Sequence, residues 1–451
     1  MMDHLQALFI DHPHICTDTR QMCSGCLFFA LQGEHFDGNL FAREALEKGA
    51  VCAVVDNPEV VPLKNEVADS RYLLVPDVLQ TLQELAAWHR RRYNIPVFAL
   101  TGSNGKTTTK ELIQAVLSER YRVTATEGNL NNHIGVPLSI LKMDSHTEIL
   151  ILEMGTSHAG EIGLLTTLSH PTAGLITNVG GAHLEGFGTP EGIKQEKGTL
   201  YDYLKTRNGT LFCHANDQAL LSMLEERHVE KNVIYYGSQL QNDGTALSPD
   251  DGLVLPQVSS ELQDGLLVVH VEGYPKIKTH LTGLYNTPNI LAALAVAEHY
   301  GVEREQAVAA VAGYVPSNHR SQWIRTSKNV LIADAYNANP VSMKLALENL
   351  VSIPGTNKCA VLGDMLELGT YTEQAHAEMV QMVETLALEC VFWVGPYFAR
   401  AVENEKAKGL CFSKTEELIE YLKGHPPAGK IILVKGSNGI GLSRLIASEV
   451  C

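Results

Sequence analysis

The sequence predicts an α/β protein of three domains, and three observations support this expectation. The chain has 451 residues, which at roughly 150 residues per domain gives about three domains. Short apolar strands alternate with helical stretches, as in parallel sheets that are covered on both faces. A glycine-rich loop at 101–109 joins a strand to a helix. We therefore expect domains at 1–93, 94–315 and 316–451, the central one with the parallel sheet of a phosphate-loop protein and the last one Rossmann-like.

The composition excludes several classes of function. The chain carries 35 Lys and Arg against 51 Asp and Glu, a formal net charge of −16, so no nucleic-acid or anionic-membrane partner is expected. The apolar share of 45% is that of a folded enzyme. No apolar run approaches about 18 residues, and the N-terminus lacks the features of a signal peptide. Nine scattered cysteines suit reduced thiols, so we expect a cytoplasmic protein.

The first domain mixes short strands with helices. Its strands are expected at 27–31 and 51–55, and its helices at 41–48 and 78–93. The basic run at 89–92 is interpreted as a solvated helix end that the helix dipole favours. Cys23 and Cys26 have CxxC spacing, but no further ligands follow at zinc spacing. A turn is therefore favoured over a metal or redox site.

The central domain alternates strands and helices. Its strands are expected at 96–100, 123–126, 148–154 and 173–178, and a helix at 106–120. The turn-rich stretch at 231–282 is interpreted as an antiparallel excursion. A helix over 288–300 follows, because Thr287 suits an N-cap, Pro288 the first helical position and Gly301 the residue past the end.

The last domain repeats the alternation. Its strands are expected at 329–333, 359–362, 391–394 and 431–434, with helices between them. Asn339 and Pro340 open one of these helices as a cap followed by proline. This pattern predicts the Rossmann-like domain.

The loop TGSNGKTTT at 101–109 is the strongest signal for function. Phosphate oxygens need several donors within a short reach, and a glycine turn at a helix N-terminus supplies backbone N–H groups. We expect Lys106 to reach the phosphates of a nucleotide and Thr107 to offer its hydroxyl to Mg²⁺. Leu100 stands where the common pattern has glycine, so the loop is a variant. The predicted ATP-binding residues here are Gly102, Ser103, Asn104, Gly105, Lys106, Thr107 and Thr108.

Polar residues at neighbouring strand ends are expected to complete this site, because open parallel sheets bind ligands at their carboxyl edge. Glu153 follows an apolar strand and is placed to hold Mg²⁺ directly or through water. Asn178 and His183 follow the next strand. A lone histidine is more often structural, so the prediction for His183 depends on its position.

Taken together, the motifs resemble the Mur ligase family, in the family's order and nearly end to end. The matching stretches are TDTR at 17–20, FALQG at 29–33 with DG at 37–38, TGSNGKTTT at 101–109, GNLNNHIGVP at 128–137, AHLEGFG at 182–188, DAYNANP at 334–340 and GDMLELG at 363–369. The last two are typical of the branch that adds D-alanyl-D-alanine. The resemblance implies a uridine-diphosphate-binding first domain, a central ATPase domain and a C-terminal ligase domain.

The activity that the resemblance implies is ATP-dependent peptide-bond formation in cytoplasmic peptidoglycan precursor synthesis, and so a role in cell-wall biogenesis. A carboxylate of a UDP-N-acetylmuramoyl-tripeptide would become an acyl phosphate, and the amine of D-alanyl-D-alanine would then displace phosphate. ATP and Mg²⁺ are the implied cofactors, the two substrates are the implied partners, and we expect a monomer. Because two anions must meet, Lys106 and Mg²⁺ would neutralise the charge between them.

Further site residues follow from matching positions. Lys197 resembles the lysine that family members carbamylate, which turns a cation into an anion. The implied metal ligands are Thr107, Glu153, His183 and Lys197, and the implied catalytic residues are Lys106, His183, Lys197 and Arg320. The implied substrate-binding residues are Thr19, Arg20, Gly33, Asp37, Asn129, Asn131, Asn132 and His133.

The second half of the nucleotide site is implied by later segments. Asn286 and Asn289 resemble adenine-side asparagines, although Asn289 could equally satisfy backbone groups in a first helical turn. Arg320 resembles an arginine that reaches the phosphates, Asp334 a ribose-binding aspartate, and Asn337 would lie beside the nucleotide. Because these groups lie outside the domain of Lys106, catalysis is expected to require domain closure.

Two positions depart from the family pattern. Thr199 stands where a glutamate is usual, and Lys194 lies near Lys197, which could also be a surface lysine. Asn438 stands where an arginine is usual, which weakens the assignment of 434–439 to a peptide carboxylate. Lys435 and Arg444 are the cations that would have to compensate.

Three alternatives remain open at this point. One is a sister enzyme within the family or a folylpolyglutamate-type ligase, against which the stretches at 334–340 and 363–369 argue. Another is a P-loop NTPase that acts as a switch or motor, which leaves the first 93 residues unexplained. The third is a nucleotide-binding regulatory protein that has lost its chemistry, which the retained Lys106, Glu153, His183 and Lys197 disfavour.

Overall fold

The computed structural model describes residues 1–64, 67–180, 184–239, 256–317, 319–448 and 450–451. They form two compact units, each discontinuous in sequence. The first unit comprises Met1–Ala99, Arg122–Thr156 and Gly160–Ala173, and the second comprises Leu100–Tyr121, Ser157–Ala159 and Gly174–Cys451. Within these described ranges, none of the helices combines the length and the apolar character needed to cross a bilayer.

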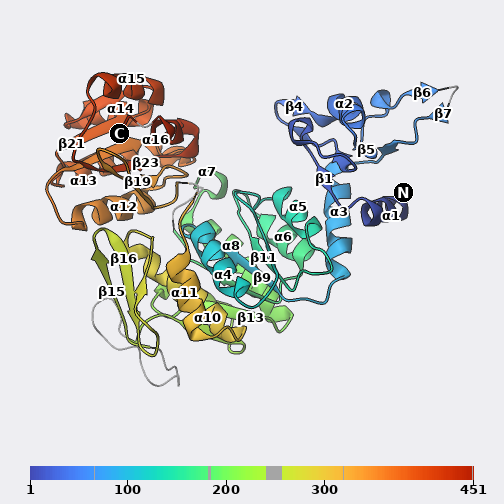
Figure 1. Ribbon diagram of the computed structural model, residues 1–451, viewed down its shortest axis with the longest axis horizontal. Helices are drawn as coiled ribbons and strands as arrows, with labels where there is room; N and C mark the ends of the chain where they lie inside the picture. The colour runs from blue at the N-terminus through green and yellow to red at the C-terminus, as the bar shows by residue number, and fades with distance from the viewer. Residues whose placement is uncertain (65–66, 181–183, 240–255, 318, 449) are drawn as a thin grey trace. The chain divides into compact units, whose positions relative to one another are not determined.

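The N-terminal part of the first unit is a four-stranded parallel sheet (Figure 1). Its strand order is β1-β2-β5-β8, with β1 at Ile15–Cys16, β2 at Leu27–Phe29, β5 at Cys52–Val55 and β8 at Tyr72–Leu74. Both predicted strands are present, and β2 and β5 are fully buried, as their unbroken apolar runs require. The predicted helix at 41–48 is a 3₁₀ turn, η2 (Gly38–Phe41), followed by α2 (Ala42–Glu47).

Helix α3 (Val78–Arg91) ends differently from our prediction. Arg91 is exposed, but His89 and Arg90 are buried. The Arg90 guanidinium donates to the carbonyl oxygens of Ser169 at 2.8 Å and Tyr93 at 2.7 Å, and to two further carbonyls at longer range. The last carbonyls of a helix lack intrahelical donors, and Ser169 is the last residue of α6 (Glu161–Ser169). The interpretation of 89–92 as a solvated helix end was therefore wrong for its first two residues.

The central sheet has six strands in the order β10-β11-β9-β12-β13-β14. The strands are β9 (Val97–Thr101), β10 (Val123–Ala125), β11 (Ile149–Glu153), β12 (Ala173–Ile176), β13 (Thr210–His214) and β14 (Val233–Tyr236). The four predicted strands are confirmed within a few residues. β14 pairs parallel with β13, so the antiparallel excursion begins later than predicted.

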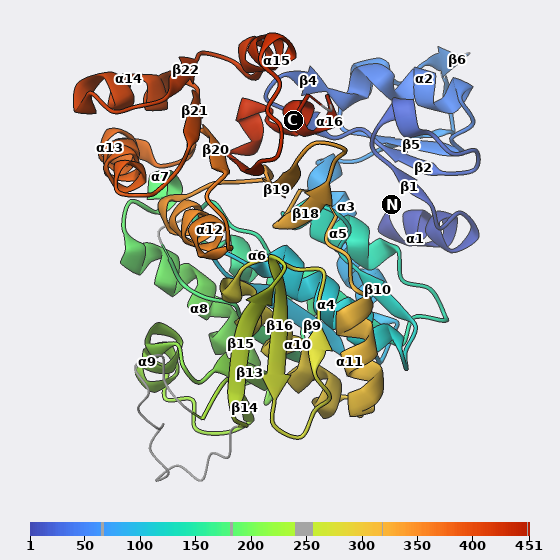
Figure 2. The same ribbon diagram turned by 60° about the vertical axis from the view of Figure 1, so that its left-hand side comes forward.

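That excursion is a three-stranded antiparallel sheet of β15 (Val258–Gln263), β16 (Leu266–Val271) and β17 (Ile277–Lys278). It precedes α10 (Thr287–His299), which packs against α4 (Lys106–Ser118) (Figure 2). The N-cap of α10 is Asn286 rather than Thr287, one residue before the predicted position. Gly301 has φ +71°, as expected of a residue past a helix end.

The C-terminal sheet has the order β18-β19-β23-β20-β21-β22 and confirms the Rossmann-like prediction. Four predicted strands form its middle, namely β19 (Val330–Asp334), β20 (Lys358–Gly363), β21 (Cys390–Val394) and β23 (Ile431–Lys435). Two edge strands were not predicted, antiparallel β18 (Gln322–Arg325) and parallel β22 (Leu410–Phe412). Helices α12 (Pro340–Ser352), α13 (Thr372–Glu384) and α14 (Pro396–Glu405) pack on one core, and α15 (Thr415–Gly424) and α16 (Ser443–Ala447) on another.

One pair of cysteines contradicts the expectation of reduced thiols. Cys359 and Cys390 are register partners on the adjacent strands β20 and β21, with their Cα atoms 4.8 Å apart, and they form a disulfide. The expectation came from an odd count and from scattered positions, and neither of these shows which residues face each other across strands. Cys23 and Cys26 flank a turn, as predicted.

Candidate active site

The predicted phosphate loop joins β9 to α4, and in space it lies against the end of β12. Gly102 has φ +151°, and a Cβ atom there would lie 1.9 Å from Thr177 Oγ1. Only glycine permits this approach. The first glycine of the loop is therefore required by its packing as well as by its conformation.

The loop backbone is fastened to the residues that follow β12. Ser103 N donates to Asn178 O and Asn104 N to Asn178 Oδ1, both at 3.0 Å. Asn104 O accepts from Thr177 Oγ1 at 2.7 Å and from Asn178 Nδ2 at 2.9 Å. The structure thus places Asn178 at the loop, as predicted, where it fixes the loop's shape.

Lys106 and Thr107 begin α4, and Thr108 follows them in its buried first turn. Lys106 Nζ donates to Gly102 O at 2.7 Å, which brings the cation back over the loop. The first N–H groups of a helix and its dipole favour an anion at this end. Charge, donors and loop shape therefore fit a phosphate group.

Asn286 and Asn289 pack behind the loop. Asn289 Nδ2 donates to Asn286 Oδ1, and Asn286 Nδ2 donates to Thr282 O, both at 2.8 Å. Asn289 Oδ1 accepts from Thr109 Oγ1 at 3.1 Å and would lie 2.9 Å from a Cβ atom on Gly105. The two amides support each other and the loop, and their contact with adenine stays a prediction.

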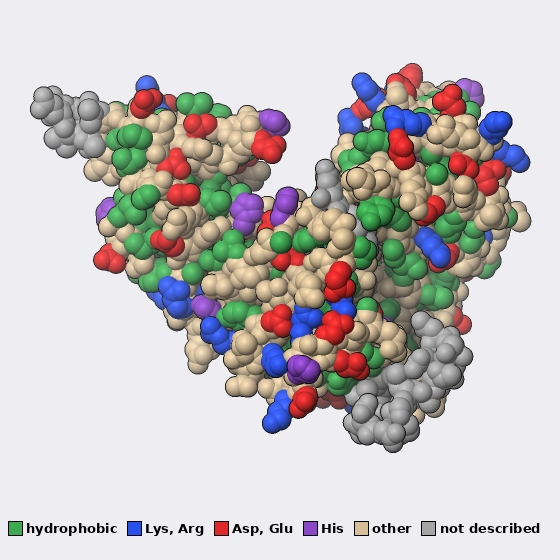
Figure 3. Space-filling model, turned by 180° about the vertical axis from the view of Figure 1, so that it is seen from behind, with side chains coloured by type: hydrophobic (Ala, Val, Ile, Leu, Met, Phe, Trp, Pro, Cys, Tyr) green, Lys and Arg blue, Asp and Glu red, His purple; other side chains and the backbone are tan. Residues whose placement is uncertain are grey.

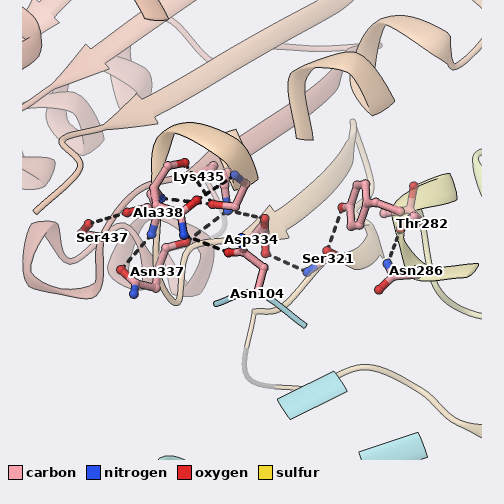
Figure 4. Close-up of polar contacts among 12 residues, drawn as sticks. Asn104, Thr282, Asn286, Ser321, Asp334, Asn337, Ala338, Lys435 and Ser437 are labelled. Atoms are coloured by element: carbon pink, nitrogen blue, oxygen red, sulfur yellow. Dashed lines mark hydrogen bonds and ion pairs between the residues drawn. The ribbon is translucent and has the colours of Figure 1, made fainter. Parts of the chain in front are cut away.

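Asp334 is the centre of a polar cluster at the end of β19 (Figure 4). Its Oδ2 pairs with Lys435 Nζ at 2.6 Å, and its Oδ1 accepts from Ser321 N at 3.1 Å. Lys435 is 2% exposed and also donates to Asn337 O at 3.1 Å. Figure 4 shows Asp334 between Lys435 and Ser321. Both carboxylate oxygens are thus engaged by the protein, and the loop that carries Asn337 is held to β23.

Arg320 lies next to this cluster. Its guanidinium carbon is 3.6 Å from the ring centroid of Tyr336, a cation–π contact. Its Nε atom is buried and has no hydrogen-bond partner among the described residues. The structure thus places Arg320 against Tyr336 of the stretch at 334–340, and its contact with a phosphate stays a prediction.

Lys197 lies on α8 (Pro190–Thr206) and is 1% exposed. Burial and, secondly, the charge of Lys106 lower the pKa of Lys197 to about 7. Lys194 instead pairs with Glu226 at 2.5 Å. The surface-lysine interpretation therefore suits Lys194 and is wrong for Lys197.

The predicted metal ligand Glu153 belongs to the first unit. It ends β11 and is buried. Its Oε1 accepts from Asn131 Nδ2 at 2.8 Å, and its N–H donates to Thr126 Oγ1 at 3.1 Å. Asn131, predicted to bind substrate, thus orients this carboxylate.

The remaining residues of the stretch at 128–137 have contacts of their own. Asn132 Oδ1 accepts from Ile134 N and Gly135 N at the start of α5 (Gly135–Leu141). His133 O accepts from Gln83 Nε2 of α3 at 3.0 Å, and Asn129 is exposed. Hydrogen bonds therefore fix the conformation of this stretch within the first unit.

The other predicted substrate residues lie in the N-terminal sheet region. Arg20 forms a bidentate pair with Asp18, and its hydrogen bonds lower the pKa of Asp18 to about 2. Thr19 is buried, and its carbonyl accepts from Lys48. Asp37 Oδ1 accepts from Asn39 N at 2.9 Å. Gly33 lies in β3 (Gln32–Gly33), against the ring of Phe36.

The structure also bears on the remaining residues that the sequence analysis named. His183 lies outside the described residues. Thr199 Oγ1 donates to Gln195 O within its own helix. Lys435 pairs with Asp334 and Arg444 pairs with Glu416, and a compensating role of either cation for Asn438 stays a prediction.

Two residues of this region were missed or misjudged from sequence. Asn339 was interpreted only as a helix cap, yet it also bonds the phosphate loop. Lys435 was considered as a ligand of a peptide carboxylate, yet its partner is the protein's own Asp334. The lysine follows an apolar strand run, and that position was the available signal that it is buried.

A phosphate loop at one parallel sheet, followed by a second α/β sheet with a polar strand end, is the arrangement of a nucleotide-binding protein. Three family models match in order. They are the Mur ligase family, catalytic domain at 13–90, the Mur ligase middle domain at 100–297, and the Mur ligase, glutamate ligase domain at 319–438. The chain belongs to the Mur ligase family.

Comparison with individual proteins gives a more specific result than the family models. The chain is 35% identical over 441 residues to UDP-N-acetylmuramoyl-tripeptide–D-alanyl-D-alanine ligase of Bacillus subtilis, covering 96% of this chain and 92% of that one. A crystal structure of MurF from Acinetobacter baumannii has a TM-score of 0.82 at 29% identity, covering 97% and 93%. MurF ligase from Thermotoga maritima, in complex with ADP, has a TM-score of 0.80 at 26% identity, covering 97% of both chains.

Proposed function

We propose that this chain is an ATP-dependent ligase that joins D-alanyl-D-alanine to a UDP-N-acetylmuramoyl-tripeptide in cytoplasmic peptidoglycan precursor synthesis. The observation that carries the proposal is the 35% identity to the B. subtilis ligase over nearly the full length of both chains. The stretches DAYNANP and GDMLELG support this branch over a sister ligase. We propose the domain bounds 1–93, 94–315 and 316–451, and a monomer.

The nucleotide half of the proposed site lies in the second unit. Gly102 to Thr108 would surround the phosphates, and Lys106 would place its charge on the transferred one. Arg320, stacked on Tyr336, would provide a second cation, and Asp334 and Asn337 would lie along the nucleotide. Asn286 and Asn289 would reach its base. The ADP complex of the T. maritima relative supports nucleotide binding by this chain.

The side chains that the resemblance implies as Mg²⁺ ligands, each taken within its own unit, have the chemistry that the ion prefers. Glu153 provides a buried carboxylate with one oxygen oriented by Asn131, and Thr107 provides a buried hydroxyl. Hard oxygen donors of this kind suit the ion. When bound, Mg²⁺ supplies charge neutralisation between two reacting anions. His183 is proposed as a further ligand on resemblance alone.

Lys197 is proposed to be carbamylated. The reaction needs a neutral amine, which attacks the carbon of CO₂ and loses a proton, so that the lysine becomes an anion. The lowered pKa of Lys197, about 7, leaves much of the amine neutral at cytoplasmic pH. The carbamate would then serve as the oxygen ligand that the resemblance implies.

The chemistry proceeds by two displacements. The substrate carboxylate attacks the γ-phosphorus, the bond to the bridging oxygen breaks, and ADP leaves. The amine of D-alanyl-D-alanine then attacks the acyl carbon, loses a proton and expels phosphate. Lys106 lowers the barrier of the first step by compensating the charge where the two anions meet. The exposed Arg20, with Thr19, Gly33 and Asp37, would hold the UDP end, and the loop with Asn129, Asn132 and His133 the peptide end.

The test is phosphate release from ATP with Mg²⁺, with each substrate added alone and then both together. Release that requires both, together with a UDP-linked pentapeptide found by mass spectrometry, is expected. Release without either substrate would instead indicate a P-loop NTPase. Activity with a single amino acid in place of D-alanyl-D-alanine would indicate a sister ligase.

A further inference from the structure

A side chain of the phosphate loop contacts the region of the C-terminal sheet. Phosphate binding alone does not require this contact. Asn339 Nδ2 donates to Asn104 Oδ1 at 2.8 Å, across 235 positions of sequence. Figure 4 shows Asn104 beside the loop that carries Asn337 and Ala338. The contact therefore joins the phosphate loop to the residues that open α12.

Asn339 uses both ends of its amide. Its Oδ1 accepts from Ser342 N at 2.8 Å, and Ser342 Oγ accepts from Asn339 N at 3.1 Å, which together form a capping box. An N-cap needs only an acceptor, so serine, threonine or aspartate would serve equally well. The amide donor is not needed by the cap, and it reaches Asn104. Asn339 is 8% exposed, so water competes little for this hydrogen bond.

Both partners are held from behind. Asn104 is fixed through its backbone by Thr177 and Asn178. The loop before Asn339 is fixed to β23 through Lys435, which bonds Asp334 and Asn337. Because neither side chain can move independently of its backbone, a displacement of Asn339 displaces the backbone at Asn104, and the reverse also holds.

We propose that Asn339 is a positioning residue that holds the phosphate loop in its nucleotide-binding shape through Asn104. The same contact sets the position of the stretch at 334–340 on that loop, so the two halves of the nucleotide site are assembled as one. This proposal deepens the proposed nucleotide site and rests on it.

The main test uses Asn339→Ser. Serine keeps an oxygen for the cap but is too short to reach Asn104. We expect the Kd for ADP with Mg²⁺ to rise roughly three- to tenfold, the usual worth of one buried hydrogen bond. In nucleotide-free protein, amide hydrogen exchange should quicken in a peptide covering 102–108 and stay unchanged in α12.

Ser342→Ala is the matched control, because it weakens the capping box and leaves the Asn339–Asn104 bond in place. It should quicken exchange at the start of α12 and leave the peptide covering 102–108 and the Kd for ADP unchanged. This pattern is the reverse of that expected for Asn339→Ser, so a merely structural role of Asn339 in the cap is distinguished from positioning.

A double-mutant cycle completes the test. Asn339→Ser should have no further effect on ADP affinity once Asn104→Ala has removed its partner. Additive effects, or wild-type loop exchange in Asn339→Ser, would overturn the proposal. If wild-type protein bound no ADP, the proposed nucleotide site would fail, while the exchange comparison would still decide whether the contact holds the loop.

Discussion

Lys197 is a lysine placed where a charged ammonium is costly. Burial and the charge of Lys106 lower its pKa to about 7, against about 10.4 in an unfolded chain. Between these values the unfolded chain binds a proton that the folded protein does not bind, so this residue makes the free energy of unfolding rise with pH. Below about pH 7 Lys197 is protonated in both states, and the full cost of burying its charge lowers the free energy of unfolding.

Lys197→Met should therefore be more stable than wild type at pH 7 in CO₂-free buffer, with the difference shrinking towards pH 10. Urea unfolding at pH 6, 8 and 9.5 measures this. Lys205→Met, at an exposed lysine of the same helix, should show no such trend. Lys197→Met should also lose ligation activity, whereas Lys205→Met should keep it. A stability difference that is constant with pH would contradict the lowered pKa.

Lys106 is the residue on which phosphate transfer most depends. Lys106→Met removes the cation that lies over the loop, and we expect kcat for ligation to fall by roughly 10³-fold or more. Lys344→Met removes an exposed lysine of α12 and should leave turnover unchanged. Near-normal turnover of Lys106→Met would refute the assignment of the loop.

The residue contacts that matter at the site were the hardest to predict. The motif at 101–109 could be identified because its chemistry is local, with glycine, lysine and threonine on consecutive residues. Asp334 and Lys435 are 101 positions apart, and Asn104 and Asn339 are 235 apart. Spacing in the sequence carries no record of such pairs, so neither of them was predicted.

At the scale of elements, most strands with a continuous apolar run were predicted, including the edge strand β10, but the buried strand β13 and the edge strand β22 were not. β9, β11 and β20 are continuous apolar runs buried on both faces, and their positions followed from this pattern. β22 has only three residues, with Leu410 exposed, so its apolar run is too short to indicate a strand. The same reasoning misjudged 89–92, because a basic run looks alike whether its cations face water or helix-end carbonyls.

Helix α3 provides a test at this scale. Arg90→Met removes the guanidinium donor from the carbonyl oxygens of buried Ser169 and half-buried Tyr93. We expect a loss of about 2–3 kcal/mol in the free energy of unfolding, measured by urea denaturation. Arg91→Met, one residue on and exposed, should change it by less than about 0.5 kcal/mol. Equal effects of the two variants would show that the carbonyl contacts of Arg90 contribute little.

At the scale of the whole molecule, acidic and basic side chains are interspersed over the described part of the face in Figure 3. The net charge of −16 opposes anionic substrates in general. Binding must therefore come from local cations, and it should appear as stabilisation of the folded state.

ADP with Mg²⁺ at a hundred times its Kd should add about 2.7 kcal/mol to the stability of the part that binds it. Calorimetry should show Tm rising by several degrees, and less when EDTA removes Mg²⁺. If the two units unfold in separate transitions, only the transition of the unit that holds the phosphate loop should move. Lys106→Met should abolish most of the shift, and an unchanged shift in that variant would place ADP elsewhere.

The interleaving of the two units along the chain has a consequence for synthesis. The first unit begins at Met1 but takes its last segment from residues up to Ala173, with part of the second unit intervening. At the usual synthesis rate of about 5–20 residues per second, roughly 4–15 s separate the emergence of Ala99 from that of Ala173. During that interval the helix end at Arg90 lacks the Ser169 carbonyl that it will bind. A ribosome-bound nascent chain therefore exposes this buried arginine to chaperones and proteases until its distant partner has been made.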